Sequence, residues 1–571
     1  MEPVRERRWR LRETDRALVS AVAREAGVPE LLARLLVNRG VTDAGAVSRF
    51  LAATLADCHD PLLLRGMAEA VDRLLVAWRE GEPVCVYGDY DVDGITATAL
   101  LVDFFRTAGF TCFYHIPNRM DTGYGLAGTG IRTAAAAGAR IIVSVDCGIT
   151  AVAEAELCRD LGIDLIITDH HTPGGTIPSA CAVINPHQPG CSFPFKLLAG
   201  VGVAFNLLIA LRSRLREAGA FNGGEGPNLR AYLDLVALGT IADIVPLADE
   251  NRLFVQFGLK ELTSGHRIGI AALKKVAGVR GDVSGFDVGF RLAPRLNACG
   301  RLEDATRGVE LLLCRAPAEA LAIAGELDAS NAERQQIEQE ILRDALVRLK
   351  VEGKGRTGIV LASAEWHPGV IGIVASRIVE LYHRPTVLVA LKDGTGRGSG
   401  RSIPAFHLYE ALAACSENLQ KFGGHKYAAG LSVAEEALER FIEEFDAHAA
   451  GLLAPDDLVP ELLIDAELSP EEISPELVSL TVRLEPCGAG NPAPLFLLRN
   501  VSVVDRRVLK DKHLKLRLAF PGGALDALAF NRGDFDCAGV VDLVFSPEIN
   551  VWNGRESLQL KIRDLRNAGE G

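Results

Sequence analysis

The sequence lacks any Cys-x-x-Cys pair, although its 571 residues include 12 cysteines. Zinc ribbons and disulfide frameworks are built from cysteines at regular spacings, so this scatter argues against both. Several of the cysteines, such as Cys85 and Cys147, lie inside apolar runs. We interpret them as small core residues.

A long apolar run is also missing. The longest uncharged apolar-rich stretch lies between Lys196 and Arg212, and it is shorter than the roughly 20 residues that a membrane-spanning helix needs. The first residues, MEPVRERRWR, are charged and contain no apolar segment like that of a secretory signal. We therefore expect a cytoplasmic protein with no membrane partner.

Excess positive charge is absent as well, because the net charge is −13. This value argues mildly against nucleic acid as a partner. However, carboxylates around a metal ion are neutralised there, and a binding groove needs only local positive potential. Basic residues do cluster in two segments, FRLAPRLNACGR (290–301) and DRRVLKDKHLKLR (505–517). Such runs are solvated faces by default, and nucleic-acid contacts are the alternative.

The length predicts several domains. Residues 1–80 have a helical pattern without a chemical motif, and 81–315 and 351–455 have the strand and helix alternation of α/β domains. Between them, 316–350 predicts one helix of about 50 Å, at 1.5 Å per residue. Residues 456–571 contain short strand-like runs at close spacing, which favour a small closed β barrel.

Three apolar runs, at 84–87, 141–145 and 163–167, each lead into acidic residues. Ala-rich helical segments separate them, which predicts a parallel sheet with right-handed crossovers. Ligands of such sheets bind beyond the carboxyl ends of the strands. We expect the side chains that follow the runs to gather there: Asp89, Asp91, Asp93, Asp146, Asp169, His170 and His171. A further apolar stretch at 233–247 brings Asp243 to the same place.

Carboxylates this close together need a cation among them to remain ionised. Oxygen ligands with one or two imidazoles and no thiolate favour Mn²⁺ or Mg²⁺. Asp91 and Asp93, on backbone expected to be extended, are predicted to face opposite sides and to serve different ions, with Asp146 bridging. Two such ions suit hydrolysis of a phosphoester. The alternative for TDHH alone is a capping aspartate followed by two surface histidines.

These segments resemble a known family. GDYDVDG, VDCG, TDHH and TIADIVPL resemble the four motifs of the DHH phosphoesterase superfamily. Six further segments narrow the resemblance to its bacterial single-strand-specific 5′→3′ exonucleases: IPNRMDTGYGL, LAPRLNACGR, LDASNAERQQIE, WHPGVIGIVASR, GSGRSIP and GGHKYAAG. The motifs occur in the family's order from about residue 83 to 565. The resemblance implies an α/β multidomain fold: a parallel-sheet DHH domain and a DHHA1 domain joined by the long helix, then an OB-type barrel.

The resemblance also implies roles for residues. The metal ligands would be Asp91, Asp93, Asp146, His170 and Asp243. Asp89 would ligate or support the site, and His171, next to His170, would be a second ligand or a proton donor. Asp169 would belong to the catalytic residues with Asp89 and His171. Arg119, Ser399 and Arg401 would hold a 5′-phosphate. Further DNA contacts would come from Arg295, Asn297, Arg301 and His425, and in the barrel from Arg506, Arg507, Lys510 and Lys515. Cys487 departs from the family, which more often has an aromatic residue there.

We therefore expect a single-stranded-DNA exonuclease that uses two Mn²⁺ or Mg²⁺ ions and acts as a monomer in repair and recombination. A helicase and a single-strand-binding protein are its expected partners. One alternative is a phosphoesterase for short oligonucleotides or small phosphoanhydrides, although such relatives generally lack the barrel. Another is a DNA-binding scaffold without activity, although such proteins lose the aspartate ligands.

Overall fold

The computed structural model describes residues 4, 6–117, 125–302, 304–353, 355–537, 539–552 and 554–569. Contacts divide the chain into two compact units. One contains residues 1–10, 301–303 and 328–462, and the other contains 11–300, 304–327 and 463–571. Among the described helices, none is both long and apolar enough to cross a membrane.

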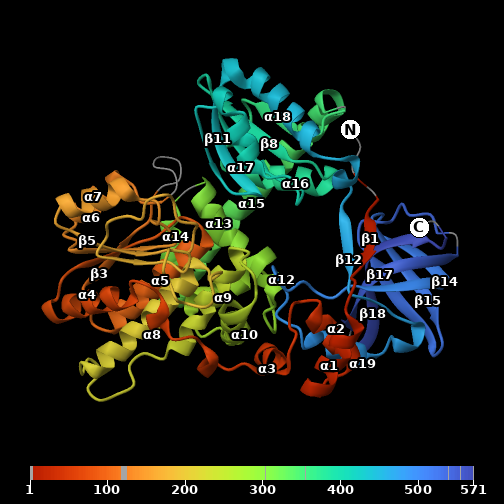
Figure 1. Ribbon diagram of the computed structural model, residues 1–571, viewed down its shortest axis with the longest axis horizontal. Coiled ribbons are helices and arrows are strands. Elements are labelled where there is room, and N and C mark those ends of the chain that lie inside the picture. Colours follow the sequence, from red (N-terminus) through yellow and green to blue (C-terminus); the bar gives the residue numbers. More distant parts are fainter. Residues whose placement is uncertain are drawn as a thin grey trace. The chain divides into compact units, whose positions relative to one another are not determined.

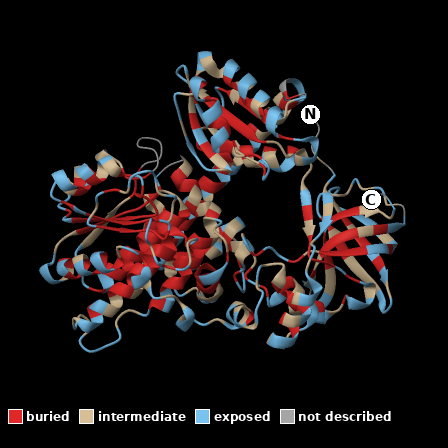
Figure 2. Cartoon of the chain, viewed as in Figure 1, coloured by how far each residue is buried: buried red, intermediate tan, exposed pale blue. Residues whose placement is uncertain are grey.

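The larger unit contains the predicted parallel sheet (Figure 1). Its strand order is β3-β2-β4-β5-β6, and every pairing is parallel. The strands are β2 (Val84–Tyr87), β3 (Cys112–His115), β4 (Ile141–Val145), β5 (Asp164–Thr168) and β6 (Ala182–Ile184). Figure 2 shows β2, β4, β5 and β6 as largely buried, as expected when helices cover both faces, whereas the edge strand β3 is half-buried.

Alternate side chains of these strands enter two different cores. Val84 and Val86 pack in a core with α4 (Met67–Glu80), α5 (Val92–Thr107) and α8 (Gly200–Glu217). Cys85 and Tyr87 pack on the other face with α6 (Gly128–Ala136) and α7 (Val152–Asp160). This two-sided burial explains why the strands are continuous apolar runs.

The apolar stretch at 233–247 is a helix, α9 (Leu233–Ala242), and not another strand. All of its residues from Leu233 to Thr240 are buried, because α5, α8 and α10 (Asp249–Ser264) pack around it. A helix surrounded in this way is apolar on every side, so its sequence carries no periodic signal. The helices that follow are α11 (Ile268–Val276), α12 (Gly285–Asp287), α13 (Ala293–Leu302) and α14 (Thr306–Leu313).

The predicted long helix is α15 (Pro317–Glu352). The smaller unit that it enters has a mixed sheet in the order β10-β11-β9-β8-β7. The strands are β7 (Ile359–Ser363), β8 (Thr386–Lys392), β9 (Thr395–Arg401), β10 (Lys421–Gly424) and β11 (Ala428–Ala434). The helices α16 (Ile371–Tyr382), α17 (Leu408–Ala414) and α18 (Leu438–Leu452) cover this sheet. In the same unit, β1 (Arg8–Leu11) begins beside β12 (Glu461–Ile464).

The C-terminal strands form the expected closed barrel. They are β14 (Phe496–Leu509), β15 (His513–Phe520), β16 (Gly523–Ala529), β17 (Val540–Trp552) and β18 (Arg555–Asn567), and pairing of β14 with β17 closes the ring. The short β13 (Ala466–Glu467) pairs with β14, and α19 (Pro475–Val482) precedes the barrel. The helices α1 (Arg16–Ala26), α2 (Glu30–Val37) and α3 (Ala44–Ala52) share one apolar core with it.

Candidate metal centre

The first acidic residues of the site lie where β2 leads into α5. Asp91 is the N-cap of α5, and its Oδ1 accepts hydrogen bonds from the N–H groups of Asp93 (2.9 Å) and Gly94 (3.1 Å). Asp93 lies in the first helical turn. The expectation of extended backbone here is therefore wrong. An extended chain would direct residues two apart to the same side, whereas the start of the helix separates the two carboxylates.

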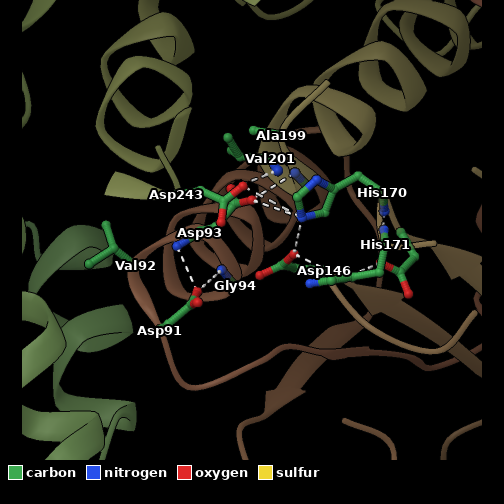
Figure 3. Close-up of polar contacts among 12 residues, drawn as sticks. Asp91, Val92, Asp93, Gly94, Asp146, His170, His171, Ala199, Val201 and Asp243 are labelled. Carbon is green, nitrogen blue, oxygen red and sulfur yellow. Dashed lines mark hydrogen bonds and ion pairs between the residues drawn. The ribbon is translucent and has the colours of Figure 1, made fainter. Parts of the chain in front are cut away.

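The other members arrive from three separate elements. Asp146 follows β4 with φ +60°, and His170 and His171 follow β5. Asp243 is the C-cap of α9. Figure 3 shows these side chains converging on one place, as the strand-end argument predicts for β2, β4 and β5.

His170 lies at the middle of this group. Its Nε2 is 3.1 Å from Asp146 Oδ1, 3.6 Å from Asp243 Oδ2 and 3.9 Å from Asp93 Oδ2. Three sets of donor atoms each lie within 4.8 Å of one another: Asp89, Asp91 and Asp146; Asp93, His170 and Asp243; and Asp146, His170 and His171. Asp146 and His170 each belong to two of these sets. Of the two, Asp146 fits a ligand shared between ions, because a carboxylate offers two oxygens.

The donor set fits hard divalent cations. In the described part of the chain, Asp243 Oδ2 and His170 Nε2 are buried and have no hydrogen-bond partner; the 3.1 Å approach of His170 Nε2 to Asp146 is a contact without hydrogen-bond geometry. Burying such atoms is costly unless something binds them. Carboxylate oxygens with imidazole nitrogen, and no thiolate, can hold Mn²⁺ or Mg²⁺ here.

Electrostatics lead to the same conclusion. Burial, together with the charge of Asp91, raises the pKa of Asp93 to about 7. Burial and the charge of Asp93 raise the pKa values of Asp146 and Asp243 well above their usual range. Burial lowers the pKa of His170 to about 3, which leaves the imidazole neutral and able to act as a ligand. Without a cation, these buried carboxyl groups would therefore be protonated and neutral rather than ionised.

Asp169 is positioned to hold the two histidines. It is 1% exposed, and its Oδ1 accepts from the backbone N–H groups of His170 (2.7 Å) and His171 (3.0 Å) and lies 2.7 Å from His171 Nδ1. Its Oδ2 accepts from the Ile149 N–H at 2.8 Å. Burial opposes its ionisation, but the hydrogen bond and charge of His171 lower the pKa of Asp169 overall. Burial likewise opposes protonation of His171, but Asp169 raises the pKa of His171 above its ordinary value.

Sequence reasoning missed the contribution of α8. The N–H groups of Gly200 (2.7 Å) and Val201 (2.9 Å), at the start of this helix, donate to the two oxygens of Asp93. A helix N-terminus favours negative charge. Gly200 also allows close approach, because a Cβ there would lie 2.6 Å from Asp146 Oδ1. The only hint of this contact in the sequence is the pair of glycines in LAGVG, and glycines are too common for the pair to have predicted it.

Comparison with known proteins agrees with this geometry. Residues 83–240 match the DHH family N-terminal domain, 355–451 match the DHHA1 domain, and 464–564 match the RecJ OB domain. The single-stranded-DNA-specific exonuclease RecJ of Escherichia coli is 42% identical, over 95% of this chain and 96% of that protein. The chain belongs to the RecJ family.

Other RecJ proteins extend the comparison. The Bacillus subtilis RecJ is 38% identical over 98% of this chain and 70% of its own length. A crystal structure of RecJ in complex with Mn²⁺ from Thermus thermophilus has a TM-score of 0.85, with 34% identity, over 98% of this chain and 79% of that one. A Mg²⁺ complex from the same source has a TM-score of 0.79, with 32% identity, over 98% and 78%.

In this RecJ-family chain, α13 supports the metal centre from the side. Asn297 Oδ1 accepts a hydrogen bond from the Val92 N–H at 3.2 Å, and a Cβ at Gly300 would lie 2.4 Å from Tyr90 O. Arg295 donates to Arg291 O at 2.5 Å. Arg301 belongs to the smaller unit and donates to Gly369 O at 3.2 Å. Asn297 thus helps to hold the turn that carries Asp91 and Asp93, in addition to any contact that it makes with DNA.

The predicted phosphate residues of the smaller unit lie together. On β9, Arg401 Nη1 is 3.2 Å from Ser399 Oγ and 2.7 Å from Gly400 O. Both side chains lie against the first turn of α16, where a Cβ at Gly372 would be 2.8 Å from Ser399 Oγ and 3.2 Å from Arg401 Nη2. The His425 N–H donates to Ala428 O at 2.8 Å, between β10 and β11. Arg119 lies outside the described residues.

The four basic barrel residues lie on or next to β14 and β15, and two of them already have acidic partners. Arg507 is 2.8 Å from Asp505 Oδ2, and Lys515 is 2.7 Å from Asp526 Oδ2. Arg506 donates to the Phe535 carbonyl oxygen at 2.8 Å. This acceptor is neutral, so the contact does not offset the positive charge of Arg506. Lys510 is exposed in the turn after β14.

Proposed function

We propose that this protein is a metal-dependent exonuclease that degrades single-stranded DNA from the 5′ end and releases 5′-mononucleotides. The observation that carries the proposal is the convergence of five aspartates and two histidines from four elements into sets of donor atoms 4.8 Å or less apart. The match of residues 464–564 to the RecJ OB domain and the 42% identity to the Escherichia coli RecJ support a nucleic-acid substrate.

Two Mn²⁺ or Mg²⁺ ions would be held by Asp91, Asp93, Asp146, His170 and Asp243, with Asp146 shared. When bound, such ions supply activation of water and stabilisation of charge on the phosphate. Asp89, fully buried beside Asp91 and Asp146, would ligate or support the first ion. Asp169 would orient His170 and His171 from behind, as acidic partners of ligating histidines do.

His171 would hold a proton for the leaving oxygen. Its side chain is one-third exposed, so it can reach a substrate, and Asp169 at 2.7 Å favours its protonated form. A positioned acid with a raised pKa is suited to proton transfer near neutral pH. The alternative role as a ligand fits its membership of the third donor set.

Selection of the 5′ end would come from Ser399 and Arg401, together with Arg119. A guanidinium and a hydroxyl next to the first turn of a helix are suited to a phosphate. The tight space at Gly372 supports this use, because a larger residue would displace both side chains. The rest of the strand would be bound by His425, Arg295, Asn297, Arg301 and the barrel cations.

The decisive assay compares substrates. We expect Mn²⁺-dependent release of mononucleotides from 5′-phosphorylated single-stranded DNA, with much slower cleavage of duplex DNA and of a dinucleotide. Preference for the dinucleotide would favour the small-substrate alternative. DNA binding without cleavage at any Mn²⁺ or Mg²⁺ concentration would favour the scaffold. The helicase and single-strand-binding partners, the monomeric state and the cytoplasmic location stay predictions.

A further inference from the structure

Two phenylalanines of the larger unit are exposed although they stack on each other. Phe286 is 59% exposed and Phe290 is 69% exposed. Their ring centroids are 4.7 Å apart with an interplanar angle of 25°. Aromatic rings contribute most when buried, and exposed apolar patches often mark binding sites. The pair therefore leaves flat apolar faces in solvent, which calls for an explanation.

The local structure holds the pair in this orientation. Ser284 and Asp287 form a capping box that starts α12, and a π-helical turn, Val288–Leu292, follows it before α13. Val288 and Leu292 are fully buried and anchor the turn, while Phe286 and Phe290, four residues apart, project from its other side. Single π-helical turns are frequent at functional sites.

The same segment borders the proposed metal centre. The π-helical turn packs on α9, where a Cβ at Gly289 would lie 3.9 Å from Ile241 Cγ2, two residues before Asp243. On α13, Asn297 binds the acidic turn through the Val92 N–H. Phe290 precedes Asn297 by seven residues, which is about 10 Å along a helix axis. The exposed rings are thus within a short length of single strand from the acidic cluster.

A second exposed apolar residue lies at the same end of α9. Ile244 directly follows Asp243, is 74% exposed, and has φ +61°. A β-branched residue in this left-handed region is a true outlier, and strain of this kind clusters at ligand-binding sites. Ile244 is therefore a further exposed apolar side chain directly beside a proposed metal ligand in the chain.

Positive charge accompanies the rings. Arg291 is exposed next to Phe290, with Nη1 3.0 Å from Asp287 Oδ1, and Arg295 is one turn further along. Exposed ion pairs of this kind are weak, so Arg291 can exchange Asp287 for a phosphate. Aromatic faces beside basic groups are how proteins grip single strands without regard to sequence.

We propose that Phe286 and Phe290 form a stacking platform for bases of the single strand, on the 3′ side of the bond that is cut. The inference rests on the proposed function and adds to it a binding site that recognises bases rather than phosphates. Because every base has a flat π face, the platform would serve any sequence.

The test is a double variant, Phe286→Ala with Phe290→Ala, titrated in EDTA with 5′-phosphorylated oligonucleotides that carry one abasic unit at successive positions. For the unaltered protein we expect one or two positions near the 5′ end at which the abasic unit weakens binding by about 5- to 150-fold. The double variant should bind intact DNA more weakly by that same factor. An abasic unit at those positions should then weaken its binding no further. Its salt dependence should match that of the unaltered protein, because stacking releases no counterions.

Three controls separate the possible outcomes. Leu161→Ala, at the end of α7 and 38% exposed, removes an exposed apolar side chain elsewhere and should bind normally. Phe→Tyr at both positions should keep the binding, whereas Phe→Leu should not. A double variant that binds intact DNA normally, or whose binding is still weakened by an abasic unit at the same one or two positions, overturns the platform; the exposed rings would then be a surface for a protein partner. An unaltered protein that neither binds nor cuts single strands contradicts the proposed function itself.

Discussion

At the scale of single residues, Asp146 is the proposed shared ligand of the two ions. It belongs to two donor sets and lies 3.1 Å from His170. Its φ of +60° determines how it should be tested. Alanine is strained in that region, whereas asparagine tolerates it, so Asp146→Asn removes the charge and keeps the backbone.

We predict that Asp146→Asn lowers turnover on single-stranded DNA at least about a hundredfold, because both ions lose a shared ligand. DNA affinity measured in EDTA should change less than about threefold. The matched control is Asp164→Asn, at the opposite end of the same sheet, where Asp164 pairs with Arg73 at 2.6 Å on the surface. Turnover above about a tenth of the normal value at saturating Mn²⁺ would show that Asp146 is not a shared ligand.

The sequence predicted that these charged side chains lie together, because each follows a recognisable apolar run or belongs to a motif, and the structure brings them together. It could not identify the groups that hold them. The bond from the Gly200 N–H to Asp93 joins residues 107 positions apart, and backbone donors carry no side-chain signature. Asp91 and Asp93 do lie in the cluster, but the backbone predicted for them was wrong, because the start of a helix was interpreted as the end of a strand.

At the scale of elements, α16 and β9 form the proposed phosphate pocket between them. Gly372 on the helix faces Ser399 and Arg401 on the strand with no room for a methyl group. The position of the helix against the strand therefore sets the geometry of the pocket.

We predict that Gly372→Ala reduces the preference for a 5′-phosphate over a 5′-hydroxyl about tenfold, because Ser399 and Arg401 must move. Arg401→Ala should have a similar effect, and the two changes together should fall short of additivity. Gly451→Ala on α18, where a Cβ meets nothing within 4 Å, is the control. Competition assays with the two kinds of 5′ end measure the ratio, and equal losses on both ends would mean that these residues hold an internal phosphate.

Elements differed in how well the sequence predicted them. The barrel strands were predictable because alternation and close turns survive on a half-exposed sheet. The stretch at 233–247 was not, because a fully buried helix and a buried strand are both continuous apolar runs. Nothing local indicated that α1, α2 and α3 would share a core with barrel strands more than 400 residues away in the chain.

At the scale of the whole molecule, the acidic cluster links metal binding to stability. Asp93 titrates with a pKa of about 7 in the metal-free fold and near 4 when unfolded. Between these values the folded chain binds more protons, so its stability falls as pH rises. The raised pKa values of Asp146 and Asp243 act in the same direction. His170, with its pKa lowered to about 3, acts oppositely, whereas His171, with its pKa raised, acts with the three carboxylates. Asp169, with its pKa lowered, is ionised in both the folded and the unfolded chain above pH 5 and does not contribute there.

We predict that in EDTA the melting temperature of the larger unit falls by several degrees between pH 5 and pH 7.5, and that Mn²⁺ removes this fall by binding the ionised carboxylates. Calorimetry across that range measures both. Asp93→Asn should flatten the profile in EDTA and weaken the effect of Mn²⁺. A melting temperature that rises with pH in the unaltered, metal-free protein would contradict the assignment of raised pKa values.

The barrel is joined to the rest of its unit too closely to be removed as a test. Its core includes side chains of α1 and α2. Arg252 of α10 lies 3.8 Å from the Phe50 ring and donates to the carbonyls of Leu484, Glu485 and Pro486. Deletion after residue 455 would expose these faces, and an insoluble product would say nothing about DNA. Substitution of surface charges is therefore the informative experiment.

We predict that Arg506→Ala with Lys510→Ala weakens binding to long single strands and makes the dependence of log K on log salt shallower by about 0.7 per lost phosphate contact. Arg507→Ala and Lys515→Ala should change the slope less, because Asp505 and Asp526 already compensate those charges. Arg214→Ala, an exposed cation on α8 that pairs with Asp72, serves as the control. Fluorescence anisotropy at several salt concentrations measures the slopes. Equal slopes for the three barrel variants and the unaltered protein would mean that the barrel supports the fold and does not grip the strand, because each lost phosphate contact leaves a counterion on the DNA and must make the slope shallower.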